Sequence, residues 1–160
     1  MPNMRLFKST NTKVEVFLRK NLFYKGFRYR LHDKRLKGRP DIVFPKYKAV
    51  IFVHGCFWHA HEGCSISHIP LKHSRYWVDK FKRNRERDHQ VYQWLTNYKW
   101  RILVVWECAI RKSEFFNFDE LIDFVSCWLK SGAGSCEVSG NDELPNLNID
   151  IKCKVEVVRY

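Results

Sequence analysis

The stretch His54–Cys64, HGCFWHAHEGC, holds three histidines and two cysteines within a short span. Structural zinc takes four tetrahedral ligands from Cys and His, and the spacing of Cys56, His61 and Cys64 lets one loop wrap such an ion. A fourth ligand must come from elsewhere, and Cys108, which follows another apolar segment, is the candidate. The alternative is a set of buried free thiols beside a chance histidine.

His54 and His59 are not needed for that zinc set. A histidine near neutral pH is the natural general acid or base, and a partner carboxylate would fix its tautomer. Asp88 is the candidate partner, because it lies on the apolar face of an expected helix, where an unpaired carboxylate is costly. The ordinary alternatives are a core histidine at position 54 and a solvated Asp88 in a frayed turn. The sequence leaves open which histidine would act as the base.

Asp41 follows Pro40 at the head of an expected strand, and carboxylate oxygen is a preferred ligand of Mg²⁺. A simple turn residue is the alternative. The chain carries 29 basic against 17 acidic side chains, a net charge of +12, with basic clusters in residues 28–39 and 80–87. Such clustering is typical of a surface that follows phosphates, although a basic surface also serves solubility alone. The basic charge, Asp41 and the histidines together indicate a phosphodiesterase.

The elements that must position these groups alternate between helix and strand. A capping box at Thr12–Glu15 begins a helix that ends near Gly26. The later apolar patterns predict strands at 27–31, 41–44, 49–53 and 100–106, a helix at 74–98 in two pieces broken near Arg83, and a helix at 118–129. Segments 49–53 and 100–106 are apolar on both faces, which places them at the centre of a small mixed sheet. We expect an α/β sandwich, then a Ser/Gly-rich linker at 131–140 and a last strand signal at 149–157.

The composition indicates one domain of 160 residues with 45% apolar side chains. No apolar run approaches the length of a membrane span, and the first residues do not resemble a signal peptide. We therefore expect a soluble cytoplasmic protein without a membrane partner. In that compartment cysteines favour metal ligation over disulfides, and no metal is expected at Cys127, Cys136 or Cys153.

Four separated motifs resemble the very short patch repair (Vsr) endonucleases in order and spacing. They are Gly38-Arg39-Pro40-Asp41, His54 to His59, Asn84 with Arg87-Asp88, and Val105 to Cys108. The similarity runs from about residue 11 to 129. It implies a restriction-endonuclease-like fold of the PD-(D/E)xK superfamily, with a mixed central sheet flanked by helices and a structural zinc site. Residues 1–130 would form the endonuclease domain, and residues 131–160 a linker and C-terminal tail of unknown role.

The resemblance also implies a reaction: nicking of DNA on the 5′ side of the thymine in T·G mismatches that arise by deamination of 5-methylcytosine. The implied site residues are Asp41 and the backbone carbonyl of Val53 for Mg²⁺; His54, His59, Asp88 and Glu15, with Asp41, as catalytic groups; Cys56, His61, Cys64 and Cys108 for zinc; and Phe57, Trp58 and Trp77 as aromatics that enter the DNA stack. The capping-box role of Glu15 explains that residue equally well. Phe52, Val53 and His54 stand where the superfamily signature has its acid and lysine.

The zinc ligands around Phe57 and Trp58 suggest why two large aromatics stand in a polar loop. A metal-fixed loop would keep them exposed as a wedge for a weak mismatched step, whereas the alternative is two core aromatics. The implied partner is double-stranded DNA with a T·G mismatch, bound by a monomer at the nucleoid, and other mismatch-repair proteins are further candidate partners. Two rival functions remain: a restriction-type nuclease on unmismatched DNA, and a non-catalytic zinc-stabilised DNA-binding module.

Overall fold

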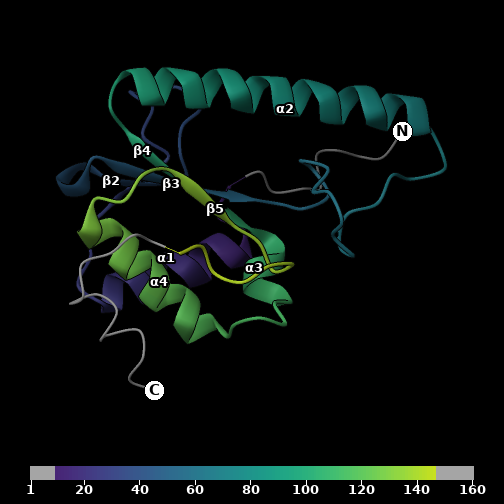
Figure 1. Cartoon of the computed structure of the whole chain (residues 1–160). Coiled ribbons are helices and arrows are strands. Elements are labelled where there is room, and N and C mark those ends of the chain that lie inside the picture. Colours follow the sequence, from purple (N-terminus) through teal and green to yellow (C-terminus); the bar gives the residue numbers. More distant parts are fainter. Residues whose placement is uncertain (1–9, 147–160) are drawn as a thin grey trace.

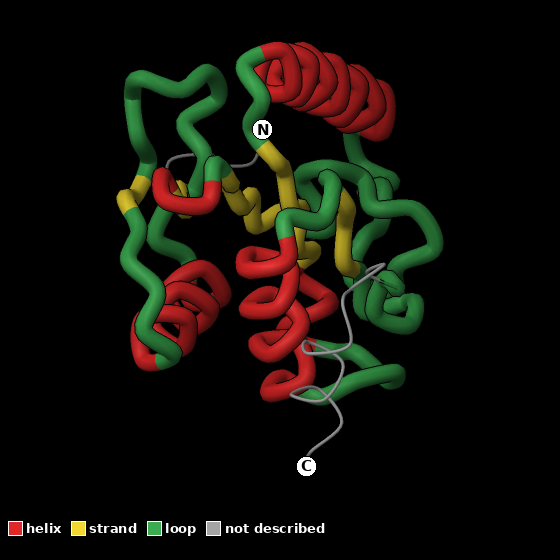
Figure 2. Tube along the Cα trace, turned by 60° about the vertical axis from the view of Figure 1, so that its left-hand side comes forward, coloured by secondary structure: helices red, strands yellow, loops and turns green. Residues whose placement is uncertain are grey.

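The computed structural model describes residues 10–146, in which a mixed sheet separates two helical layers (Figure 1). The elements in chain order are α1 (Lys13–Tyr24), β1 (Arg30–Leu31), β2 (Ile42–Phe44), the 3-10 helix η2 (Pro45–Tyr47), β3 (Ala49–His54), α2 (Ser74–Asn97), β4 (Arg101–Trp106), α3 (Glu107–Arg111), α4 (Phe118–Ser131) and β5 (Cys136–Val138). Helix α2 covers one face of the sheet, and α1, α3 and α4 lie on the other. Seen from a second direction, the strands again lie between α2 and the remaining helices (Figure 2).

The described strands form one sheet in the order β1-β2-β3-β4-β5. The pairs β1–β2 and β2–β3 are antiparallel, whereas β3–β4 and β4–β5 are parallel. In the parallel central pair, His54 lies opposite Trp106. The segments that leave the carboxyl ends of β3 and β4 therefore begin side by side, which brings the loop after His54 next to Cys108.

Both faces of the central strands are buried, as their apolar sequences predict. Ile51 and Leu103 belong to the core that contains residues of α1 and α4. Their neighbours in sequence, Val50 and Ile102, belong to a second core with Val91 and Leu95 of α2. The mixed α/β sandwich expected from the sequence is thus confirmed, and the alternation of side chains along a strand produces the two cores.

Helix α1 begins as its sequence predicts. The Thr12 side chain accepts the backbone N–H of Glu15, and the Glu15 carboxylate accepts the backbone N–H of Asn11 at 2.8 Å and the Thr12 hydroxyl at 2.9 Å. These contacts satisfy donors that a helix start leaves without an intrahelical partner. They also account for a glutamate that is only 3% exposed.

Three local expectations were wrong. Helix α2 is continuous from Ser74 to Asn97, because it contains neither Gly nor Pro to interrupt the backbone hydrogen bonds. The strand expected at 27–31 is reduced to the two exposed residues of β1, while Phe27 turns into the core. The segment 131–140, expected as a linker, contains strand β5, and the short helix α3 was not anticipated.

Strand β5 is held by contacts that the Ser/Gly-rich segment around it does not reveal. The Arg101 guanidinium donates to the backbone carbonyls of Trp128, Leu129 and Ala133, which fixes the chain as it leaves α4. The strand then pairs with β4, and Val138 is buried at its end. The strand signal at 149–157 lies outside the described residues. Across residues 10–146, no helix combines the length and apolar character needed to cross a bilayer.

Candidate active site and metal centre

A cavity of about 490 Å³ opens beside the carboxyl end of β3. The sequence-predicted groups Asp41, Val53, His54, His59 and Asp88 all line it, and so do the basic residues Lys34, Arg39 and Arg87. The fold thus brings Asp41 and Asp88, which are 47 positions apart in the sequence, to the same cavity. Glu15 does not line this cavity.

His59 and Asp88 form a close pair in this cavity. The Nδ1 atom of His59 lies 2.6 Å from Oδ2 of Asp88, and both side chains are largely buried. The contact supplies the partner that a carboxylate on the apolar face of α2 requires. It places the proton of the neutral imidazole on Nδ1 and leaves Nε2 with a free lone pair. Of the two histidines, His59 is therefore the one with the oriented geometry of a general base.

His54 is a different kind of histidine. Its ring stacks on His59 with centroids 3.8 Å apart and planes 8° apart, and its Nε2 lies 3.2 Å from the Tyr92 hydroxyl. Burial, with a smaller contribution from His59, lowers the pKa of His54 to about 3. His54 is therefore neutral at physiological pH. The hydroxyl of Tyr92, which the sequence did not mark as a site residue, orients this ring.

Asp41 is a largely buried carboxylate with few compensating contacts. One oxygen, Oδ2, accepts the backbone N–H of Val53 at 2.8 Å. Burial, assisted by the nearby charge of Glu15, raises the pKa of Asp41 to about 7. A cation beside this oxygen would supply the missing charge compensation, and carboxylate and carbonyl oxygens are the donors that Mg²⁺ accepts. The Asp41 carboxylate and the backbone carbonyl of Val53 are therefore oxygen ligands of the kind that suits a magnesium ion.

His32 links this cavity to Glu15, and sequence reasoning missed it. Its Nδ1 lies 3.8 Å from Oδ1 of Asp41, and its Nε2 lies 4.0 Å from Oε2 of Glu15. Within residues 10–146 the buried Nε2 has no hydrogen-bond partner. Glu15, expected among the catalytic groups, is thus separated from Asp41 by this imidazole. No local sequence pattern marks His32, which comes close to Asp41 because β1 and β2 pair with Leu31 opposite Ile42.

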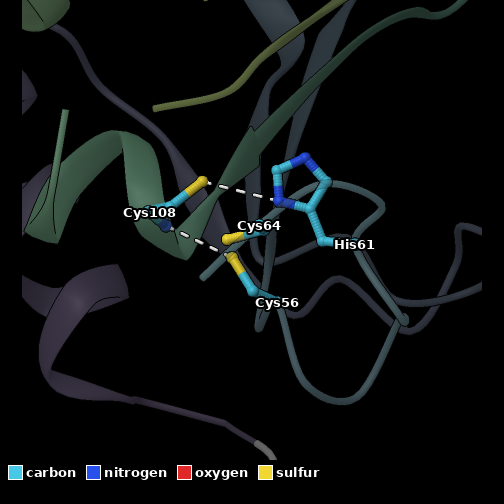
Figure 3. A group of neighbouring side chains, drawn as sticks. All are labelled: Cys56, His61, Cys64 and Cys108. Carbon is cyan, nitrogen blue, oxygen red and sulfur yellow. Dashed lines mark hydrogen bonds between the residues drawn. The ribbon is translucent and has the colours of Figure 1, made fainter. Parts of the chain in front are cut away.

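A second cluster lies at the adjacent strand ends, where Cys56, His61, Cys64 and Cys108 point toward one another (Figure 3). Their ligand atoms all lie within 4.8 Å of one another, and the three cysteines are buried. The Cys108 sulfur lies 3.5 Å from Nδ1 of His61. The hydrogen bond with Cys56 is the main cause of a lowered pKa of Cys108, about 5.

Three sulfurs and one imidazole around a buried centre are a donor set that fits tetrahedral zinc. The structure therefore brings together all four ligands that the sequence and the resemblance indicate. Cys127 and Cys136 lie apart from this cluster, in α4 and β5.

The aromatic loop differs from the exposed wedge expected from the sequence. Phe57 packs against Trp58, Trp77 and Phe81 with ring centroids 5.1–5.3 Å apart. Phe57 and Trp58 are half-buried, and Trp77 is only 4% exposed. Large apolar rings gain free energy by packing together, which explains why these side chains are not fully exposed. Asn84 also ties the loop to α2 by donating to the Trp58 carbonyl at 2.8 Å.

Together these features define a class of protein: a basic α/β domain with the groups needed for phosphodiester hydrolysis beside a Cys₃His cluster. Comparison with known proteins identifies the family. The family model described as DNA mismatch endonuclease Vsr matches residues 1–65. The DNA mismatch endonuclease Vsr of Escherichia coli (strain K12) is 36% identical over 136 residues, which cover 85% of this chain and 86% of that protein. This chain belongs to the Vsr DNA mismatch endonuclease family, as its motifs predict.

Two nicking enzymes are similar over a shorter range. The type II nicking enzyme V.NmeAIP of Neisseria meningitidis serogroup A is 48% identical over 103 residues, 64% of this chain and 73% of that protein. The type II nicking enzyme V.XorIIP of Xanthomonas oryzae pv. oryzae is 46% identical over 107 residues, 67% of this chain and 78% of that protein.

Proposed function

We propose that this protein is a Mg²⁺-dependent DNA endonuclease of the restriction-endonuclease-like, PD-(D/E)xK fold. It nicks the strand on the 5′ side of the thymine in a T·G mismatch, as a cytoplasmic monomer acting at the nucleoid. The main support is the shared cavity in which the His59–Asp88 pair and the largely buried Asp41 lie beside basic side chains. Membership of the Vsr family and the similar nicking enzymes support the substrate and the reaction.

In this reaction Asp41 and the Val53 carbonyl would hold Mg²⁺, which supplies charge neutralisation at the phosphate and a more acidic water. His59 accepts a proton at Nε2, because its Nδ1 is engaged by Asp88. Asp88 keeps the imidazole in this tautomer and stabilises the imidazolium that forms. Neutral His54 packs against His59 and holds its ring plane. The basic residues Lys34, Arg39 and Arg87 position the DNA backbone at the cavity.

Zinc at the Cys56, His61, Cys64 and Cys108 cluster would be structural. The cluster joins the loop after β3 to the start of α3, so the metal fixes the segment that carries His59. The same loop presents Phe57 and Trp58, which we propose as the wedge that unstacks the mismatched step. Because Trp77 is buried beneath them, it could enter the DNA only if the aromatic cluster opens.

Nicking assays on duplexes that differ at a single base pair, T·G or C·G, test this proposal. Wild-type protein with Mg²⁺ should nick a T·G duplex on one strand and leave the C·G duplex intact. His59→Ala and Asp41→Ala should retain binding to the T·G duplex but lose nicking by about 100-fold or more. His73→Ala, which changes an exposed histidine outside the cavity, is the matched control and should nick normally.

Two outcomes would favour the rival functions. Equal cleavage of the C·G duplex would indicate a restriction-type nuclease. Undiminished DNA binding with no nicking at any Mg²⁺ concentration would indicate a DNA-binding module.

A further inference from the structure

Residues 136–140, formed by β5 and the turn that follows it, reach the Cys₃His cluster in two ways, by a direct contact with Cys108 and by an indirect contact with His61. In the first contact, the backbone N–H of Gly140 donates a hydrogen bond to the Cys108 sulfur at 3.2 Å. Both residues are buried. A thiolate that ligates a metal carries negative charge, and hydrogen bonds to charged acceptors are among the stronger ones. This N–H therefore stabilises Cys108 in its ligating form.

The close approach to Cys108 requires glycine at position 140. A Cβ atom placed there would lie 2.5 Å from the Cys108 carbonyl oxygen and 2.7 Å from its carbonyl carbon. These are backbone atoms, so a side chain at 140 would push the two segments apart. Gly134, at the other end of β5, has nothing within 4 Å of its own Cβ position. The same substitution at the two glycines therefore separates this contact from a general effect of alanine.

The second contact reaches His61 through Trp106. The Glu137 carboxylate accepts the Trp106 indole N–H at 3.3 Å. The Trp106 ring stacks on His61 with centroids 4.0 Å apart and planes 5° apart. Glu137 thereby holds the surface against which the His61 imidazole is oriented.

We propose that residues 136–140 are the outer shell of the Cys56, His61, Cys64 and Cys108 metal centre and control how long it retains zinc. Gly140 positions Cys108, and Glu137, acting through Trp106, positions His61. Groups of this kind orient the ligands of a metal, and their loss commonly weakens metal binding about 10–100-fold. The inference gives part of the C-terminal segment a role, and it rests on the proposal that this cluster holds zinc.

Zinc release from the purified full-length protein tests the inference without reference to nicking. Each protein is mixed with an excess of a chelator whose absorbance changes when it binds zinc. The temperature is one at which circular dichroism shows that every variant is folded. Gly140→Ala should release zinc about 10–100-fold faster than wild type. Gly134→Ala should release it at the wild-type rate. Glu137→Ala should release it faster, and Glu137→Gln, which keeps an acceptor for Trp106, should restore slow release.

Cobalt substitution supplies a readout that loss of stability alone would not change. In protein loaded with Co²⁺, the thiolate-to-metal charge-transfer band should shift in Gly140→Ala but not in Gly134→Ala, because only the former loses the hydrogen bond to Cys108. If Gly140→Ala does not fold, the release rates of Glu137→Ala and Glu137→Gln decide. Wild-type release rates in both Gly140→Ala and Glu137→Ala would overturn the inference alone, whereas wild-type protein without zinc would overturn the zinc assignment itself.

Discussion

Asp41 should destabilise the metal-free active site at neutral and alkaline pH, and Asp41→Asn should relieve this effect. The amide has the shape of the carboxyl group and can still accept the Val53 N–H. It carries no charge, so it avoids the cost of burying an anion in a site that is 16% exposed at this side chain. The variant should therefore be more stable than wild type whenever Asp41 must ionise without a cation beside it.

The sign and size follow from the pKa of Asp41, which burial raises from 3.8 to about 7. The folded protein binds this proton more tightly than the unfolded chain, so stability falls as the pH rises from 3.8 toward 7. At about 1.4 kcal/mol per pKa unit, the loss at pH 8 is at most about 4 kcal/mol. For a chain of this size that corresponds to a melting temperature lower by roughly 8–16 °C. About half of this loss should develop between pH 5.5 and 8.5, where a zinc site can remain loaded.

Thermal unfolding in Mg²⁺-free buffer, without chelator, measures the effect at pH 5.5, 7 and 8.5. Asp41→Asn should melt above wild type, by a margin that grows with pH and levels off above about pH 8. Asp79→Asn, at an exposed position of α2, should melt with wild type throughout. Adding Mg²⁺ at pH 8.5 should stabilise wild type more than Asp41→Asn, because the ion binds the ionised carboxylate. A margin that is absent or independent of pH would refute the reasoning.

Three further substitutions address separate parts of the structure. Cys108→Ser should give protein that lacks zinc and unfolds at lower temperature, measured by metal analysis and melting; a folded, zinc-loaded variant would contradict the assignment. Trp58→Ala should lower stability clearly less than Trp128→Ala, which removes a core tryptophan and should cost about 3–5 kcal/mol. Trp58→Ala should also weaken binding to a T·G duplex by about 1–3 kcal/mol more than binding to a C·G duplex. Equal loss on both duplexes would remove its role in the mismatch. His32→Ala should raise the Mg²⁺ concentration needed for half-maximal nicking with little change in DNA binding, because His32 supports Asp41; an unchanged Mg²⁺ requirement would contradict this.

Features that depend on near neighbours in the chain could be predicted before the fold was known. The start of α1 follows from Thr12 and Glu15 three residues apart, a spacing that fits one helical turn. The central position of β3 and β4 follows from strands that are apolar on both faces. Three of the four metal-cluster residues lie within a few positions of one another, so one loop brings them together. The family motifs could also be recognised in the sequence, and comparison with known proteins confirmed the family.

Features that depend on burial and long-range register became visible in the folded chain alone. The pairing of Asp88 with His59, and not His54, depends on how α2 lies over the ends of β3. The opposite pKa shifts of Asp41 and His54 arise from desolvation, which spacing does not encode. Trp77 is buried because other aromatics happen to pack around it. Gly140 reaches Cys108 because β5 pairs with β4, and the Ser/Gly-rich segment around this three-residue strand carries no local signal for that pairing.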